Sequence, residues 1–189
     1  MNKQTRDWSI LAVALGAAAL LAYRAYASHF SATRVTIVGD SLAVGLTPRL
    51  SDLASGSGRT LTSHAVVGTR VTYWTPQIDQ ILSEDRPDLL LVSLGTNDAM
   101  LPNTKEFEQG VDQLLASAKR AGVKVLWILP PTMPERVALQ DAVRAVVRAK
   151  ADHYFDSTTL DIPRGGDGIH PTPQGAALWA DALWKRLFG

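Results

Sequence analysis

The feature that most constrains the fold is an alternation along the chain between short apolar runs and longer amphipathic stretches. The clearest apolar run, residues 89–93, has no polar face. Such a run is typical of a strand in a parallel sheet that is covered on both sides, so we place it at the centre of the sheet. Four further strands are predicted, at residues 34–38, 60–67, 124–129 and 154–155. Because helical stretches separate the strands, the sequence predicts a three-layer α/β/α sandwich with a mainly parallel sheet.

Proline residues, glycine residues and capping patterns mark the predicted helices. Pro48 is expected to delay or distort the start of a first helix over residues 43–54. Residues 103–106 are typical of a capping box in front of a helix that ends at Gly122. Pro134 fits the start of the helix that follows. A helix over residues 71–82 is expected to break at Pro76, and the last helix is expected to run from Pro173 to Phe188.

Length and composition exclude several classes of function. The 189 residues suffice for one domain without disulfides, and we assign that domain to residues 34–189, after a linker at 28–33. The 19 basic and 18 acidic side chains are spread along the sequence and give a net charge of +1, so no basic face for nucleic acid is expected. The absence of cysteine excludes thiol catalysis and thiolate zinc sites. His29, His64 and His153 show no metal-ligand spacing, so no metal is expected.

The amino-terminal segment, residues 1–27, is predicted to be a signal anchor or a cleaved signal peptide. Its apolar run, residues 8–23, is flanked by basic residues. As a helix it would be roughly 24 Å long, somewhat short of a bilayer core but usable with aromatic and basic residues at its ends. Ala25 and Ala27 offer small residues to a signal peptidase, so anchoring by residues 8–23 and cleavage after Ala27 both stay open. In either case we expect an extracytoplasmic domain, membrane-anchored or else secreted or periplasmic. A buried helix of the domain is disfavoured because the run has no polar stripe.

Three polar clusters follow predicted strands or precede the last helix. The first is Gly39-Asp40-Ser41, the second is residues 95–98, and the third is residues 167–171. In a mainly parallel sheet, the carboxyl ends of the strands meet at one edge and the loops there form a crevice. The side chains of the three clusters are therefore expected to lie close together.

These clusters hold the parts that an acyl-transfer site needs. A serine hydroxyl needs an imidazole to take its proton, and the imidazole needs a carboxylate to orient it. Ser41, His170 and Asp167 could form that set, because His170 and Asp167 are three residues apart. The backbone N–H groups of Ser41 and Gly68 and the side-chain amide of Asn97 are the natural donors for an oxyanion hole.

Each of these residues also has an ordinary structural explanation. Ser41 or Asp40 could simply cap the following helix, and Asn97 could cap a helix or close an Asx turn. His170 could be a histidine of a surface loop. Asp40 and Asp98 are expected to brace their loops by hydrogen bonds rather than to react.

The clusters resemble the sequence blocks of the SGNH hydrolases, also called GDSL esterases and lipases. The blocks of that family contribute Ser, Gly, Asn and His in this order, and they are matched by residues 39–42, Gly68, residues 95–98 and residues 167–171. The resemblance covers residue 34 to about residue 188. It implies a flavodoxin-like sheet and a serine esterase that needs no cofactor. It also implies that Ser41 is the nucleophile, His170 the general base and Asp167 its orienting acid, with an oxyanion hole formed by Ser41, Gly68 and Asn97.

Other functions stay open from the sequence. An acyltransferase or a thioesterase would use the same site. Asp40, Asp98 and Asp167 could instead bind Mg²⁺ for phosphoester hydrolysis, and a non-catalytic envelope-binding module is a further alternative. An α/β-hydrolase is disfavoured because the Gly-x-Ser-x-Gly elbow is absent.

The expected partner is a small-molecule, glycan or lipid ester, with the membrane as a second partner if the amino-terminal helix is retained. The resemblance allows lipids, acyl thioesters, acetylated sugars and small aryl esters. No long lid insertion is evident, so we expect a shallow cleft and favour deacetylation of an extracytoplasmic polysaccharide, ahead of cleavage of a lipid ester. Tyr73 and Trp74 could line the substrate pocket or pack in the core. A monomer is the default expectation.

Overall fold

A five-stranded parallel sheet forms the centre of the domain. The computed structural model describes residues 30–135 and 137–189. The strands are β1 (Arg34–Gly39), β2 (Thr60–Ser63), β3 (Leu89–Ser93), β4 (Lys124–Ile128) and β5 (Tyr154–Phe155). Their order is β2-β1-β3-β4-β5, and every neighbouring pair is parallel. This is the flavodoxin-like order, in which a ligand crevice forms where the chain reverses its direction of winding, between β1 and β3.

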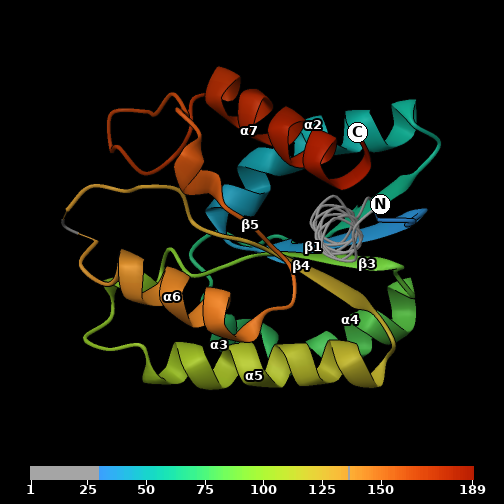
Figure 1. Ribbon diagram of the computed structural model, residues 1–189, viewed down its shortest axis with the longest axis horizontal. Helices are drawn as coiled ribbons and strands as arrows, with labels where there is room; N and C mark the ends of the chain where they lie inside the picture. The colour runs from blue at the N-terminus through green and yellow to red at the C-terminus, as the bar shows by residue number, and fades with distance from the viewer. Residues whose placement is uncertain (1–29, 136) are drawn as a thin grey trace, which may run out of the picture.

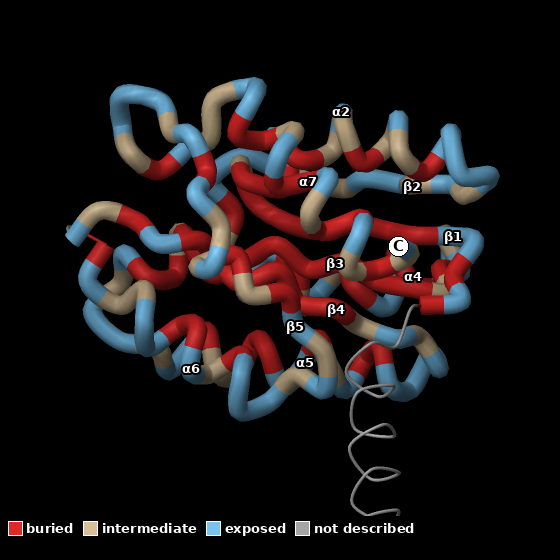
Figure 2. Tube along the Cα trace, turned by 45° about the horizontal axis from the view of Figure 1, so that its top comes forward, coloured by how far each residue is buried: buried red, intermediate tan, exposed pale blue. Residues whose placement is uncertain are grey.

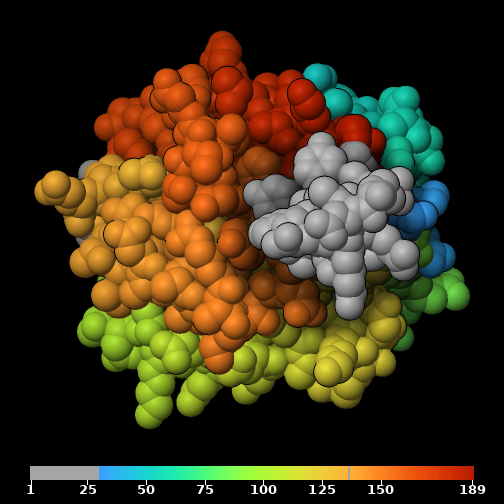
Figure 3. Space-filling model, viewed as in Figure 1, coloured from blue at the N-terminus to red at the C-terminus, as the bar shows by residue number. Residues whose placement is uncertain are grey.

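Helices cover both faces of the sheet, which confirms the three-layer α/β/α prediction (Figure 1). One layer holds α2 (Ser41–Gly56) and α7 (Pro173–Phe188), which pack against each other. The other layer holds α3 (Val71–Trp74), α4 (Ile78–Asp85), α5 (Lys105–Arg120) and α6 (Gln140–Lys150). Two short 3₁₀ helices, η1 (Asp98–Met100) and η2 (Ser157–Thr159), follow β3 and β5. Figure 3 shows the side of the molecule on which β5 lies, with the side chains around β5 drawn in orange across its centre.

The continuous apolar character of β3 follows from its position between the two helical layers. All five residues of β3 are buried. Leu89 and Leu91 belong to the core cluster under α2 and α7, whereas Leu90 and Val92 belong to the cluster under α5 and α6. Figure 2 shows β1, β3 and β4 as a largely buried band between helices whose outer faces are exposed, whereas the edge strand β2 is mostly exposed. The strand therefore needs apolar side chains at consecutive positions, as the sequence indicated.

The second strand is shorter than predicted. β2 ends at Ser63, and the residues after it form a loop. The N–H groups of His64 and Val66 still donate to the carbonyls of Ile37 and Gly39. However, β1 gives way to a helix directly after Gly39, so the ladder cannot continue. The predicted strand over residues 60–67 is wrong in its second half.

The first helix starts earlier than predicted and tolerates its proline. It begins at Ser41 rather than at residue 43, and Pro48 lies inside it without ending it. Leu42, Leu46 and Leu50 are fully buried along one side of this helix, and their packing offsets the hydrogen bond that a proline removes. The predicted break near Pro76 is confirmed, because α3 ends at Trp74 and α4 begins at Ile78.

One predicted helix start is wrong, and one predicted capping motif does not form although its helix, α5, begins at Lys105 as the motif indicated. Pro134 lies in a loop and α6 begins only at Gln140, whose side chain bonds both the N–H and the carbonyl of Met133 and so stabilises the loop instead. The capping box at residues 103–106 does not form, because the residue at the N-cap is Thr104 and its side chain makes no capping bond. The Thr104 hydroxyl instead contacts Glu108, at 2.7 Å.

No helix within residues 30–135 and 137–189 is long and apolar enough to span a membrane. The predicted signal anchor or signal peptide at residues 1–27, with its apolar run at residues 8–23, lies outside the described residues, and so does His29.

The glycine before the Asp40-Ser41 turn is predicted to be indispensable for packing. A Cβ at Gly39 would lie 2.5 Å from both the Ala43 Cβ and the Ser93 carbonyl oxygen, whereas a Cβ at Gly45, on the exposed side of α2, meets nothing within 4 Å. We expect Gly39→Ala to lower the free energy of unfolding by about 2 kcal/mol. Gly45→Ala should raise it by about 0.5–1 kcal/mol, because alanine favours the helix.

Urea denaturation of the two variants checks this pair of values. Equal stabilities of Gly39→Ala and Gly45→Ala would contradict the close backbone approach at the end of β1.

Candidate active site

Ser41 lies at the junction between β1, the strand next to the edge strand β2, and the helix α2. β1 ends at Gly39, Asp40 is the N-cap of α2, and Ser41 is the first helical residue. The Asp40 Oδ1 atom accepts a hydrogen bond from the Leu42 N–H at 2.9 Å, as a capping aspartate does. The cap is therefore Asp40, and the Ser41 hydroxyl is left partly exposed and free for another partner.

The loop before α7 carries Asp167 and His170. Its two ends are held together by a bridge between Arg164 and Pro171, with a hydrogen bond from the Gly165 N–H to the His170 carbonyl at 2.8 Å. The Thr172 side chain then caps α7 by accepting from the Gly175 N–H. A short loop closed in this way and fixed to a capped helix holds its side chains in defined positions.

The structure brings Ser41, His170 and Asp167 into one hydrogen-bonded chain. The His170 Nε2 atom lies 2.8 Å from the Ser41 Oγ atom, although the two residues are 129 positions apart. The His170 Nδ1 atom lies 2.5 Å from Asp167 Oδ2. The other Asp167 oxygen accepts from the N–H groups of Ile169 and His170, at 2.8 and 2.9 Å. This is the arrangement of a nucleophile, a base and a group that orients the base.

Hydrogen bonds keep Asp167 ionised. The side-chain bond from His170 has the largest effect, followed by the backbone N–H donors of His170 and Ile169, and together they hold the pKa of Asp167 well below its usual range. A carboxylate with this pKa remains charged wherever an imidazole can act as a base. It can therefore stabilise a protonated His170.

Three groups at the same edge of the sheet offer hydrogen-bond donors. The N–H of Ser41, at the start of α2, and the N–H of Gly68, in the loop after β2, pair with no acceptor in residues 30–135 and 137–189. Gly68 has a φ of +78° at the third position of a turn closed from Thr69 N to Val66 O, which favours glycine. The Asn97 side chain follows β3, and its Nδ2 atom donates to the Thr69 carbonyl at 2.9 Å. Its second contact, with Asp40 Oδ2, is long at 3.5 Å, so that N–H is weakly held.

These residues fall within a family that can be recognised over most of the chain. The sequence model of the GDSL-like lipase/acylhydrolase family matches residues 37–178, a span that contains all of the donors and the serine, histidine and aspartate described above. The chain belongs to this family. It is therefore a hydrolase that acts on ester bonds.

Solved structures of GDSL-type and other esterases share the fold of this family member. The chain is similar to the acetyl xylan esterase AlAXEase (17% identity, TM-score 0.71, covering 82% of this chain and 100% of that one). It is also similar to TesA (19% identity, TM-score 0.69, covering 82% of this chain and 97% of that one). A third similar structure is the psychrotrophic esterase EstA from Pseudoalteromonas sp. (17% identity, TM-score 0.68, covering 82% of this chain and 96% of that one). At these identities the likeness shows the fold alone. No curated protein sequence matches the chain.

Two carboxyl groups near Ser41 are buried, those of Asp40 and Asp98. Burial raises the pKa of Asp40 to about 7, against the opposing hydrogen bond from Leu42, and the nearby Asp98 raises it further. Burial also raises the pKa of Asp98 to about 6. Asp98 Oδ1 accepts from the Val71 N–H at 3.3 Å, and its Oδ2 atom is buried with no partner among the described residues. Each group accepts a hydrogen bond from a backbone N–H, Asp40 at the start of α2 and Asp98 at the start of α3.

Thr69 connects the loop after β2 to the strand end before Ser41, and sequence reasoning missed it. Its hydroxyl contacts the carbonyls of Val66 at 2.8 Å and Gly39 at 3.3 Å, and it accepts from the Trp74 indole N–H at 3.1 Å. Its own carbonyl holds Asn97. No pattern in the sequence marks a threonine for such a role, because its partners come from distant segments.

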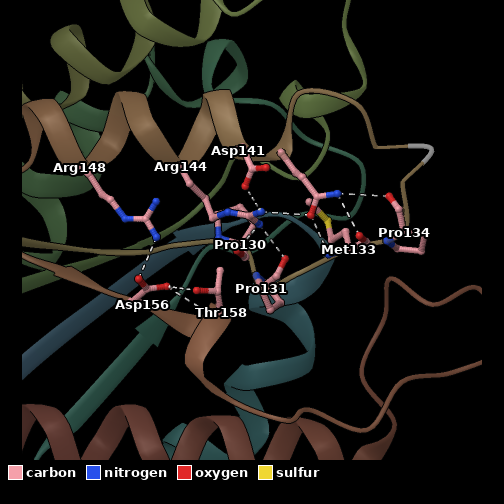
Figure 4. A network of polar contacts seen from close by, with 10 residues as sticks. Pro130, Pro131, Met133, Pro134, Asp141, Arg144, Arg148, Asp156 and Thr158 are labelled. Carbon is pink, nitrogen blue, oxygen red and sulfur yellow. Dashed lines mark hydrogen bonds and ion pairs between the residues drawn. The ribbon is translucent and has the colours of Figure 1, made fainter.

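Arg144 holds the loop between β4 and α6, and it too was missed. Its guanidinium is buried and donates to the carbonyls of Pro130 and Pro131, at 3.2 and 3.1 Å, and to the Asp141 carboxylate at 2.7 Å (Figure 4). The only sequence signal was its place beside the apolar stripe of α6, where an arginine usually reaches solvent. Proline carbonyls at the end of a strand need such a donor when they are buried.

The loop held by Arg144 supports the loop of His170. Arg164 donates from Nη2 to the Thr132 carbonyl at 3.2 Å and from Nη1 to the Ile169 carbonyl. A Cβ at Gly168 would lie 2.9 Å from Pro134, so the two loops are in close contact. The position of the histidine thus depends on packing between two loops.

The remaining predicted residues have different environments. Trp74 is buried, with 1% of its surface exposed, whereas Tyr73 is 45% exposed. His64 bonds Asp85, and the His153 ring packs edge-on against Phe30. In the described part of the chain, no three His, Asp or Glu side chains group in a way that could hold a metal ion.

The raised pKa of Asp40 predicts a specific pH dependence of stability. The unfolded chain has an ordinary aspartate pKa, so between about pH 4 and pH 7 the folded state binds more protons than the unfolded state. Protonation of Asp40 therefore stabilises the folded state. This contribution is complete below about pH 4 and is lost as pH rises towards 7. Asp40→Asn cannot titrate, so its free energy of unfolding should depend less on pH in this window. The difference in slope should reach at most about 1.4 kcal/mol per pH unit, the value for one proton.

Urea denaturation at several pH values measures the two slopes. Asp52→Asn removes an exposed carboxylate of the same helix and should leave the slope unchanged. A slope in Asp40→Asn equal to that of the unmodified protein would show that the buried carboxyl does not take up a proton.

Proposed function

We propose that the chain is a serine esterase that hydrolyses carboxylic esters through an acyl-enzyme on Ser41. The observation that carries the proposal is the pair of hydrogen bonds made by His170, to Ser41 Oγ at 2.8 Å and to Asp167 Oδ2 at 2.5 Å. One imidazole that contacts both a partly exposed serine and a carboxylate is what base-assisted attack requires.

In the first half-reaction, Ser41 Oγ attacks the carbonyl carbon of the ester while His170 Nε2 takes the hydroxyl proton. Asp167 accepts the hydrogen bond from Nδ1–H and stabilises the imidazolium. The carbonyl oxygen gains negative charge, which the N–H groups of Ser41 and Gly68 and the Asn97 amide stabilise. The C–O bond to the leaving alcohol then breaks, and His170 returns its proton to that alcohol.

In the second half-reaction, water replaces the alcohol. His170 takes a proton from the water as it attacks the acyl carbon, and the same donors stabilise the second tetrahedral intermediate. The bond to Ser41 Oγ breaks, and Oγ regains its proton from His170. A thiol leaving group would make the enzyme a thioesterase, and another acceptor in place of water would make it an acyltransferase.

We place the enzyme outside the cytoplasm, anchored by residues 8–23 or released by cleavage after Ala27. In that location the accessible esters belong to envelope or extracellular glycans and to lipids. Removal of acetyl groups from a glycan is our first choice of substrate, and the likeness of the fold to that of an acetyl xylan esterase supports this choice. Cleavage of a lipid ester is the second.

A panel of p-nitrophenyl esters from acetate to palmitate tests the activity, combined with covalent labelling by a fluorophosphonate. The proposal predicts ester turnover and labelling, loss of both in Ser41→Ala, and no effect of a chelator. Loss of activity in the presence of a chelator would favour a metal-dependent phosphoesterase instead. Absence of both turnover and labelling in the full chain would refute the hydrolytic site.

The Asn97 amide is predicted to contribute to the transition state rather than to binding. We expect Asn97→Ala to lower kcat by about a hundred- to a thousandfold, with a much smaller change in KM, because the donor matters most when the oxygen is charged. Steady-state kinetics on a p-nitrophenyl ester measure the two constants.

Asn103→Ala is the matched control. Asn103 accepts a hydrogen bond from Lys105 N–H in the loop before α5 and donates to none of the proposed reacting groups. A loss of kcat in Asn97→Ala no larger than that in Asn103→Ala would remove Asn97 from the oxyanion hole.

A further inference from the structure

A cavity lies against the loop that follows the edge strand β2 and carries Gly68. Its volume is about 350 Å³, which is within the range of small-molecule sites. It lies between the loop after β2 and the helices α3 and α4. The side chains that give it its character are His64, Val66, Tyr73, Gln77, Gln80 and Glu84.

The loop after β2 connects this cavity to the oxyanion donors, because it carries both Val66 and Gly68. Val66 lines the cavity, and its N–H bonds the carbonyl of Gly39, two residues before Ser41. Thr69, in the same loop, accepts from Trp74 on the cavity side and from Asn97 on the side of the site. An ester bound at Ser41 can therefore extend over this loop into the cavity.

The lining of the cavity is polar and ordered. Asp85 accepts hydrogen bonds from the buried Thr36 hydroxyl at 2.8 Å and from His64 Nε2 at 2.9 Å. This contact holds the imidazole, which lines the cavity. The side-chain amides of Gln77 and Gln80 are each held by one hydrogen bond, because their Nε2 atoms donate to the Tyr73 carbonyl and to Glu84 Oε1, respectively.

The hydrogen bonds of the two amides leave several polar atoms for a ligand. The Oε1 atoms of both glutamines and the Tyr73 hydroxyl have no partner among the described residues. Each can bond a hydroxyl group. The Tyr73 ring is 45% exposed at the rim and is held edge-on against the buried Trp74, with ring centroids 5.1 Å apart. It therefore offers an aromatic face at little cost in entropy.

The charge and polarity of the cavity exclude two other kinds of ligand. No lysine or arginine lines it, while Glu84 lines it and Asp85 lies directly behind His64. An anionic group such as a phosphate would be repelled. A long acyl chain would contact apolar lining residues such as Val66 and Ile81, but it would also cover the polar groups of the cavity without bonding them, which is unfavourable. A neutral ligand with many hydroxyl groups and an apolar ring face fits both observations.

We propose that this cavity is a subsite for a sugar ring of a glycan ester, with Tyr73 stacking on the ring and Gln77, Gln80 and His64 bonding its hydroxyls. This inference rests on the proposed ester hydrolysis at Ser41 and selects the glycan over the lipid substrate. The acyl group lies at Ser41 and the neighbouring ring lies beyond the loop of Gly68.

The test compares two substrates that share the acyl group. For the full chain, kcat/KM is measured on p-nitrophenyl acetate and on short partially O-acetylated xylo-, manno- and chito-oligosaccharides. In Tyr73→Ala the ratio of the best oligosaccharide value to the p-nitrophenyl acetate value should fall about tenfold, mainly through KM. Tyr73→Phe should restore most of it, and Gln80→Ala should lower it by a smaller factor.

Tyr154→Ala is the matched control, because Tyr154 is similarly exposed, at 40%, but lies in β5 at the opposite edge of the sheet. It should leave the ratio unchanged. A ratio that is the same in Tyr73→Ala and Tyr154→Ala overturns the subsite. Turnover of p-nitrophenyl acetate without turnover of any oligosaccharide also overturns it and leaves the esterase proposal standing. Absence of turnover of every substrate, together with absence of fluorophosphonate labelling, refutes both.

Discussion

The hydrogen bond between His170 and Ser41 is the contact on which the rest of the site depends, because it joins segments from opposite ends of the domain. A parallel sheet makes this contact achievable, since all of its strands end at one edge. Ser41 comes from the end of β1 and Asn97 from the loop after β3, while His170 is held by the last helix on the face shared with α2. The three side chains, which we propose as nucleophile, oxyanion donor and base, therefore meet only when the whole sheet and both helical layers are assembled. Loss of packing in any layer would separate them.

The sequence predicted the parts of the fold that depend on local pattern. The apolar run that forms β3 and the break at Pro76 were read correctly, because each reflects the covalent or packing properties of its own residues. The end of β2 and the start of α6 were not. They are decided by partners elsewhere: β2 loses its neighbour where β1 gives way to α2 after Gly39, and the Gln140 side chain holds the loop before α6. Pro48 is a further example: its own properties predicted a disturbed helix start, but the packing of the buried leucines of α2 outweighs the helix-breaking preference of proline.

The candidate site follows the same division. Ser41, Asp167, Asn97 and His170 could be selected from their motifs, because the chemistry that they suggest requires those residue types. The residues that hold these side chains in place could not be selected from the sequence. Arg144 became visible only from the proline carbonyls that it bonds, and Thr69 only from its four contacts in separate segments. The buried carboxyl groups of Asp40 and Asp98 likewise acquire their raised pKa values from burial, which a motif does not report. Supporting residues are chosen by three-dimensional neighbours, so they carry little local signal.

The central claim is that ester cleavage passes through a covalent bond to Ser41. Mass spectrometry of the protein after acid quench of p-nitrophenyl ester hydrolysis tests it most directly. The account predicts an added acyl mass on the peptide that contains Ser41, with no adduct and no turnover in Ser41→Ala. Turnover in Ser41→Ala at the rate of the unmodified protein, with the acyl mass absent or on another residue, would contradict it.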